Sequence, residues 1–247
     1  MTFSRLHLRL LLVAPLLGAL CAMPVLADEG VCTGPVTVGE DMSGLRLARV
    51  AQGRTRVNFV RNRDKAAPSC PSVSAECRTK TFVVAGDEVI VRRGDGPFVC
   101  GLYKSARGAE TAGWLPAADL EMVERRPATK SDEWAGDWRR DQEGEIRIAR
   151  KGSGVVVSGS ATWGAMDPDR VRRGAINIGE LDGAATLSAD RILIGAGYNG
   201  AKAPGQIEPS DCVARLHLLG RYVVAEDNSG CGGMNVRFTG VYLRVVK

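Results

Sequence analysis

Histidine, the commonest acid–base catalyst near neutral pH, is almost absent from this chain of 247 residues. It holds only His7 and His217, and His217 stands in the alternating segment Arg-Leu-His-Leu-Leu-Gly, which is typical of a strand. The sequence has no Gly-x-Ser-x-Gly elbow, His-Glu-x-x-His helix or phosphate-binding loop. We therefore predict no catalytic residues. Because acidic residues alone can hydrolyse glycosides, a carboxylate hydrolase acting on the cell wall stays as the alternative.

Long apolar runs are also missing, which excludes a membrane-spanning helix. The longest run, Leu10–Met23, has about 14 residues, too few to cross a bilayer of roughly 30 Å. It follows Arg5 and Arg9 and ends in Val25-Leu26-Ala27, the pattern of a secretory signal peptide over residues 1–27. We therefore expect a periplasmic or secreted protein that begins at Asp28 and has neither a membrane span nor a nucleic-acid partner.

Metal-ligand patterns are lacking as well, since the sequence has no Cys-x-x-Cys pair and His217 is the one histidine after the leader. We expect no metal and no other cofactor. Six cysteines follow residue 27, and an even number in an exported chain predicts disulfides. Cys212 and Cys231 fall in one short hairpin region and should pair. The other four allow three connectivities. Cys70–Cys77, which would close the base of a loop, is favoured, and it leaves Cys32–Cys100.

Helical periodicity is nearly absent, and short alternating segments separated by Gly, Asp, Asn and Pro predict an all-β fold. A polar stretch with a proline divides the chain into residues 28–124, a linker over 125–133, and residues 134–247. In the first half, strands are expected over 55–62, 78–93 and 97–103. In the second half, they are expected over 144–150, 154–164, 174–181, 191–198, 213–220, 221–227 and 236–246.

In the first half, the segment Thr-Ala-Gly-Trp-Leu-Pro-Ala-Ala-Asp-Leu (residues 111–120) resembles the closing part of bacterial Src-homology-3-like (SH3-like) domains. This resemblance implies a small SH3-like barrel with Trp114 and Leu115 on a late strand. Such exported domains bind peptidoglycan or peptides, or serve as structural modules. Trp114 would then be a ligand-stacking aromatic or a core residue, and we favour the core because aromatic side chains bury large areas.

The strands of the second half fit an antiparallel meander that closes into a barrel, which removes exposed strand edges. Gly-Asp-Trp at residues 136–138 and Arg244 near the end of the chain resemble calycin barrels, the group of lipocalins and avidins. That resemblance implies that Arg244 packs across the ring of Trp138. The alternative is a core Trp138 and a surface Arg244.

The glycine-rich stretch Asp-Asn-Ser-Gly-Cys-Gly-Gly (residues 227–233) precedes the last predicted strand. Its glycines allow the reversal that would bring Cys231 back to Cys212. A cation site is the alternative, although the spacing of a calcium loop is missing. The tail resembles those of exported Gram-negative bacterial proteins of no assigned activity. In the strand that follows, Val236, Phe238, Gly240, Tyr242 and Arg244 should share one face.

A basic run, residues 46–65, contains seven Lys/Arg and one acidic residue, Asp64. Strand alternation places Arg54, Arg56 and Asn58 opposite Val57 and Phe59, and Arg61 follows. Clustered guanidinium groups favour phosphate and carboxylate partners. We expect a non-catalytic binding protein for an anionic envelope polymer, a lipid head group or a protein partner. A lysozyme inhibitor is a further alternative. The chain's net charge of +5 falls to +3 without Arg5 and Arg9, and this positive charge counts against that alternative because lysozymes are commonly basic.

Overall fold

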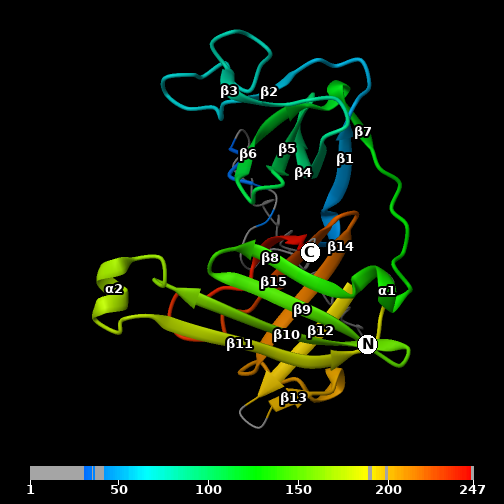
Figure 1. Cartoon of the computed structure of the whole chain (residues 1–247). Helices are drawn as coiled ribbons and strands as arrows, with labels where there is room; N and C mark the ends of the chain where they lie inside the picture. Colours follow the sequence, from blue (N-terminus) through cyan, green and yellow to red (C-terminus); the bar gives the residue numbers. More distant parts are fainter. Residues whose placement is uncertain (1–30, 35, 37–41, 189–190, 198–199, 246–247) are drawn as a thin grey trace, which may run out of the picture.

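The computed structural model describes residues 31–34, 36, 42–188, 191–197 and 200–245, so the predicted signal peptide lies outside it. Strands make up 52 % of the structure and helices 8 %, which confirms the all-β prediction. Figure 1 shows two β-sheet units stacked end to end, with the N-terminal strands above the C-terminal ones.

The N-terminal half forms a seven-stranded antiparallel sheet with the order β3-β2-β6-β5-β4-β1-β7. Its strands are β1 (Arg46–Val50), β2 (Val57–Val60), β3 (Arg78–Val83), β4 (Glu88–Asp95), β5 (Phe98–Lys104), β6 (Glu110–Pro116) and β7 (Leu120–Met122). Two 3-10 turns, η1 (Met42–Gly44) and η2 (Ala117–Asp119), flank them. The predicted strand over 78–93 is two strands, because Gly86 turns the chain with a φ of 86°.

The C-terminal half forms a nine-stranded, nearly closed barrel sheet with the order β11-β10-β9-β8-β16-β15-β14-β12-β13. Its strands are β8 (Gly136–Asp141), β9 (Gly144–Lys151), β10 (Gly154–Trp163), β11 (Asn177–Ala185), β12 (Arg191–Gly197), β13 (Gly200–Lys202), β14 (Cys212–Leu219), β15 (Tyr222–Asp227) and β16 (Gly240–Arg244). Short helical segments are α1 (Ser131–Trp134), α2 (Pro168–Arg172) and η3 (Pro204–Gln206). Edge strand β11 lies close to β12, the strand next to the other edge: Gly183 of β11 faces the Ile194 side chain so closely that a Cβ there would lie only 2.1 Å from Ile194 Cγ2.

The predicted linker is shorter than expected. Helix α1 begins at Ser131, inside the range 125–133, and carries Trp134 into the core of the barrel. Trp134 Nε1 donates a hydrogen bond to the Ala128 carbonyl (3.1 Å), and Ala128 is itself buried. The end of the linker is therefore part of the barrel.

The last strand is also shorter than expected. β16 covers Gly240–Arg244 rather than residues 236–246. The residues just before it are bound to the buried carboxylate of Asp227, which accepts hydrogen bonds from the backbone N–H groups of Phe238 (3.1 Å) and Thr239 (2.8 Å). Val236, Phe238 and Tyr242 are buried as the alternation predicted. The segment 236–239, however, is held by the side-chain carboxylate of Asp227 and not by backbone pairing with another strand.

The two halves share a hydrophobic core. Leu47 and Ile90 of the N-terminal sheet pack in one cluster with Leu219, Tyr222 and Val224 of the barrel. Buried polar contacts cross the same boundary: the Tyr222 hydroxyl donates to the Glu88 carbonyl (3.0 Å). The halves are therefore held together by packing as well as by the linker.

Three disulfides join Cys32–Cys100, Cys70–Cys77 and Cys212–Cys231, the pairs favoured from the sequence. The first two lie with Trp114 and Phe98 in a small core of their own. The third ties the start of β14 to the glycine-rich stretch.

Candidate binding site

The arginines singled out in the basic run do not project together from one strand. β2 begins only at Val57, so Arg54 and Arg56 precede it. Each of the three has a different partner: Arg54 pairs with Asp119 (2.7 Å), Arg56 lies over the ring of Phe82 (3.8 Å to the centroid), and Arg61 pairs with Asp64 (3.3 Å). Arg56 and Asn58 nevertheless share a face, because Phe82, whose ring Arg56 covers, is the cross-strand partner of Asn58. Val57 and Phe59 are buried, as the alternation predicted. Arg54 is bound separately, by Asp119.

Positive charge is nevertheless concentrated around the hairpin formed by β2 and β3, which we call the basic hairpin (residues 54–84). It holds seven Lys/Arg and two Asp/Glu, a net charge of +5 that equals the formal charge of the whole chain. β3 is an edge strand, and its exposed Arg78, Lys80 and Phe82 share one face. Lys65 and Lys80 have no ion-pair partner among the residues that the structure describes. In Figure 1 the hairpin lies at the end of the molecule farthest from β13.

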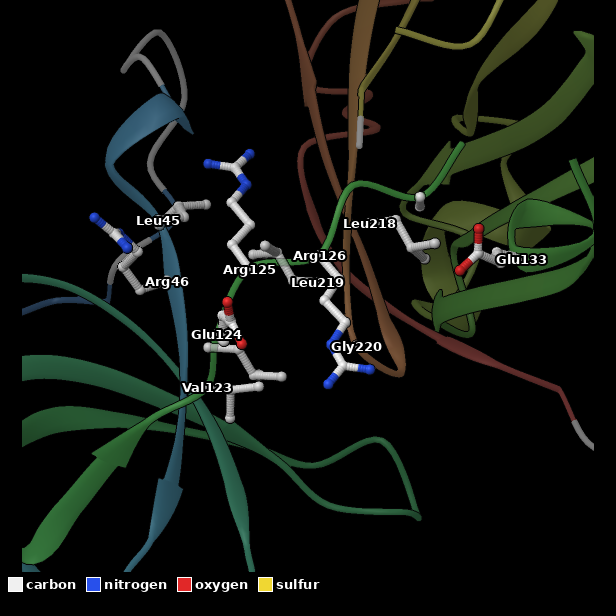
Figure 2. A pocket seen from close by; sticks show the side chains of 12 residues that line it. Leu45, Arg46, Val123, Glu124, Arg125, Arg126, Glu133, Leu218, Leu219 and Gly220 are labelled. Atoms are coloured by element: carbon white, nitrogen blue, oxygen red, sulfur yellow. The ribbon is translucent and has the colours of Figure 1, made fainter. Parts of the chain in front are cut away.

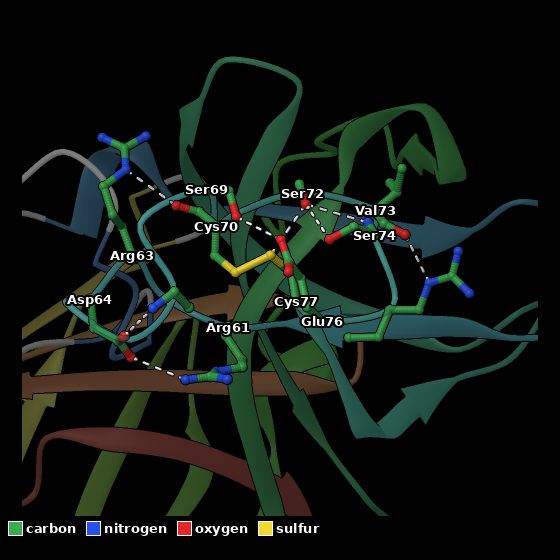
Figure 3. The surroundings of a disulfide bond; sticks show 12 residues. Arg61, Arg63, Asp64, Ser69, Cys70, Ser72, Val73, Ser74, Glu76 and Cys77 are labelled. Atoms are coloured by element: carbon green, nitrogen blue, oxygen red, sulfur yellow. Dashed lines mark hydrogen bonds and ion pairs between the residues drawn. A yellow bond between two sulfur atoms is a disulfide. The ribbon is translucent and has the colours of Figure 1, made fainter.

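The loop between β2 and β3 is held in shape by its own contacts (Figure 3). The Cys70–Cys77 disulfide closes its tip. Arg63 Nε donates to the Cys70 carbonyl (3.2 Å), and Arg78 Nε donates to the Val73 carbonyl (2.9 Å). Val73, at this tip, is 59 % exposed, and Phe82 and Val84 are each 40 % exposed. The hairpin thus presents apolar side chains beside its cations.

Both candidate tryptophans are core residues. Trp114 is 4 % exposed and packs beside the two N-terminal disulfides, so its ring is closed to a ligand. Trp138 is 1 % exposed, and its Nε1 donates to the Trp134 carbonyl (2.9 Å). Arg244, its cross-strand partner on β16, lies over the ring with 4.4 Å between the guanidinium carbon and the centroid. The contact expected from the calycin resemblance is present.

A groove of about 340 Å³ lies where the two halves meet (Figure 2). Three separate segments line it: the start of β1, the linker after β7, and the turn that follows β14. Its lining comprises Leu45, Arg46, Leu47, Val123, Glu124, Arg125, Arg126, Ala128, Glu133, Leu218, Leu219 and Gly220. The apolar side chains come from both halves, and the charged ones come mainly from the linker.

A second, wider groove lies beside the Cys212–Cys231 disulfide and is lined by Glu180, Asp182, Glu208 and Asp211. Lys202 occupies it, with Nζ 2.9 Å from Asp211 and 3.3 Å from Glu208. The Glu208 backbone N–H and Lys202 lower the pKa of Asp211, the opposite of what a general acid needs.

The carboxylate and amide oxygens of the glycine-rich stretch serve the fold. Asp227 holds the segment 236–239, and Asn228 Oδ1 accepts the Val213 N–H (3.1 Å). Within the described ranges, no cluster of three or more His, Cys, Asp or Glu side chains could hold a metal ion.

The sequence drew attention to the basic run 46–65, part of which belongs to the basic hairpin, but not to Arg78 and Lys80 of that hairpin or to the groove between the halves. Arg125 and Arg126 were assigned to a linker, and Leu218 and Leu219 to a strand. The one sequence signal that could have indicated a binding site here is the Arg125-Arg126 pair, which precedes a proline in an otherwise polar stretch.

Comparison with protein-family models, characterised proteins and solved structures finds no match. Among the residues that the structure describes, no helix is both long and apolar enough to cross a membrane.

Proposed function

We propose that this chain is an exported, non-catalytic binding protein that docks through its basic hairpin on the anionic phospholipid head groups of the cell envelope. The observation that carries the proposal is the net charge of +5 on residues 54–84. Guanidinium groups match phosphate oxygens with paired hydrogen bonds, and lysines add point charges. The SH3-like and calycin resemblances agree with a binding role.

The exposed apolar side chains favour a lipid surface over an acidic polymer. Val73, Phe82 and Val84 stand on the same hairpin as the cations. Exposed apolar patches mark binding surfaces, and these three could enter the boundary between head groups and acyl chains. A soluble anionic polymer would satisfy the charges alone.

The test is sedimentation of the purified protein with vesicles. We expect binding to vesicles that contain phosphatidylglycerol, weaker binding in high salt, and little binding to phosphatidylcholine alone. Lys65→Glu with Lys80→Glu should weaken binding at least about thirtyfold, since each basic residue near an anionic surface contributes about 1 kcal/mol. Neither substitution removes an ion pair with a described residue.

A matched control changes the net charge equally at the other end of the molecule. Lys151→Glu with Arg173→Glu alters two exposed residues of the barrel half that have no ion pair with any described residue. This control should bind as the parent does. Equal losses in both double variants, equal binding to both vesicle types, or retention on peptidoglycan but not on vesicles would each refute lipid docking.

A further inference from the structure

The groove between the halves is a preformed feature, because its three walls are held in place by packing and hydrogen bonding. Leu45 and Leu47 on one side and Leu219 on the other belong to one buried cluster. Val123, in the third wall, is held by a hydrogen bond from its N–H to the Leu47 carbonyl (2.9 Å). A ligand would therefore meet a formed groove and would not have to order it.

Apolar surface remains accessible in this groove. Val123 and Leu218 are only partly buried, whereas Leu45, Leu47 and Leu219 close the floor beneath them. The volume of about 340 Å³ is near the lower end of the range typical of small-molecule sites. Such a space suits one hydrocarbon chain better than a folded peptide.

The rim of the groove carries excess positive charge that is available to a ligand. Arg46, Arg125 and Arg126 face two carboxylates, Glu124 and Glu133. The Glu133 carboxylate is already engaged, since its Oε2 accepts the Lys130 N–H (3.1 Å). Arg46 and Arg126 are both exposed, and neither has a hydrogen-bond or ion-pair partner among the described residues.

Figure 2 shows how the linker distributes this charge. Arg125 and Arg126 leave the linker in opposite directions, and the Arg126 side chain extends toward Gly220. Gly220 has no side chain to fill this end of the groove, and its φ of 59° is a conformation that side chains rarely adopt. A Cβ at Gly220 would lie 2.7 Å from Leu47 Cδ2 and 3.7 Å from Glu88 Oε2, so we expect an acidic head group at the exposed Arg126 guanidinium and not at Gly220 itself.

From these features we infer that the groove is a binding site for a small amphipathic anion, a ligand with one linear apolar chain and one acidic head group. The chain lies on Val123, Leu218 and Leu219, and a rim arginine binds the head group. This site is separate from the basic hairpin and does not depend on the docking proposed above.

The test compares two ligands of equal chain length, decanoate and decanol, by isothermal titration calorimetry of the full protein below their aggregation limits. Decanoate should bind and decanol should bind more weakly. Arg46→Gln with Arg126→Gln should lower decanoate affinity about tenfold and leave decanol unchanged, because a hydrogen bond to a charged group is lost for one ligand only. The control, Lys151→Gln with Arg173→Gln, should alter neither affinity.

A blocking variant tests the location. Val123→Trp should fill the groove and abolish the binding of both ligands, while circular dichroism and the three intact disulfides report that the fold survives. Decanoate binding that persists in Val123→Trp, equal affinity of the parent for both ligands, or binding of neither would overturn the inference. Lys65→Glu with Lys80→Glu should leave decanoate binding intact, so failure of vesicle docking and failure of this site are distinguishable.

Discussion

The ammonium group of Lys104 lies 2.7 Å from the carbonyl oxygen of Arg140, so strand β5 of the first sheet is bonded to strand β8 of the second. Lys104 is 1 % exposed, and its second partner is Glu110 Oε1 at 2.6 Å. A buried ammonium group is tolerated only when it is paired. This contact therefore helps to set how the two halves meet. It thereby also helps to set the shape of the groove between them.

Lys104→Met should destabilise the protein while keeping the length of the side chain. The Arg140 carbonyl loses its charged donor and Glu110 loses its ion-pair partner, so we expect a loss of about 2 kcal/mol in the free energy of unfolding. Urea denaturation followed by circular dichroism measures it. Lys151→Met, at an exposed position, is the control and should match the parent. A Lys104→Met protein as stable as this control would show that the Lys104 contact does not hold the halves together.

Export should yield a mature chain that begins at Asp28. The expectation follows from the basic start, the short apolar run and the ending Val25-Leu26-Ala27 of the leader. Intact-mass measurement of the protein recovered from the periplasm or medium of an expressing bacterium decides it. A mass that retains Met1, or a lipid on Cys21, would contradict the signal-peptide interpretation.

The all-β fold and two of the disulfide pairs were predictable because their signals are local, whereas Cys32–Cys100, with a separation of 68 residues, followed only as the remaining pair. Alternation of apolar residues reports a strand directly, and Cys70–Cys77 and Cys212–Cys231 each fall within one hairpin or loop. Helix α1 was missed because four residues are too few to show a helical period. Similarly, alternation continues through Val236 and Phe238, although Asp227 rather than a neighbouring strand holds that segment.

The binding surfaces were harder to predict because they depend on tertiary contacts. The basic run was visible, yet the partners of Arg54 and Arg56, Asp119 and Phe82, lie far away in the sequence. No sequence pattern joins Leu47, Arg126 and Leu218, which meet only because the two sheets share a core. Charge composition therefore located the basic run 46–65, whereas the hairpin that joins it to Arg78 and Lys80, and the groove, required the structure.

The three disulfides should contribute unequally to stability. Their cysteines are separated by 68, 7 and 19 residues for Cys32–Cys100, Cys70–Cys77 and Cys212–Cys231. Because a longer closed loop restricts the unfolded chain more, replacing each pair by serine should cost about 4, 2 and 3 kcal/mol respectively. Urea denaturation of the three double variants gives the order. Peptide mapping that found free thiols or other pairs in the parent would contradict the scheme.

Asp211 should make the barrel sensitive to acid. The Glu208 N–H (2.6 Å) and Lys202 hold the pKa of this carboxyl below its ordinary value. Its contribution to stability is therefore complete above about pH 4 and is lost as the pH falls through the lowered pKa. Asp211→Asn should lower the melting temperature at neutral pH and reduce the further fall at acid pH. Glu121→Gln, at an exposed position of β7, should behave as the parent at both. If the melting temperature of Asp211→Asn fell as much between neutral and acid pH as that of the parent, other carboxyl groups would be responsible for the acid sensitivity.

The two interactions of Arg244 can be separated by two substitutions. The guanidinium lies over the Trp138 ring and also donates hydrogen bonds to the carbonyls of Ala135 and Glu133. Arg244→Ala removes both and should cost about 2 kcal/mol. It should also increase quenching of tryptophan fluorescence by acrylamide, because the ring of Trp138 loses its cover. Arg244→Lys keeps a cation near the ring but lacks the forked guanidinium that reaches two carbonyls, so its stability should be intermediate.

If Arg244→Ala were as stable as the parent, Arg244 would be a surface charge at the end of a strand.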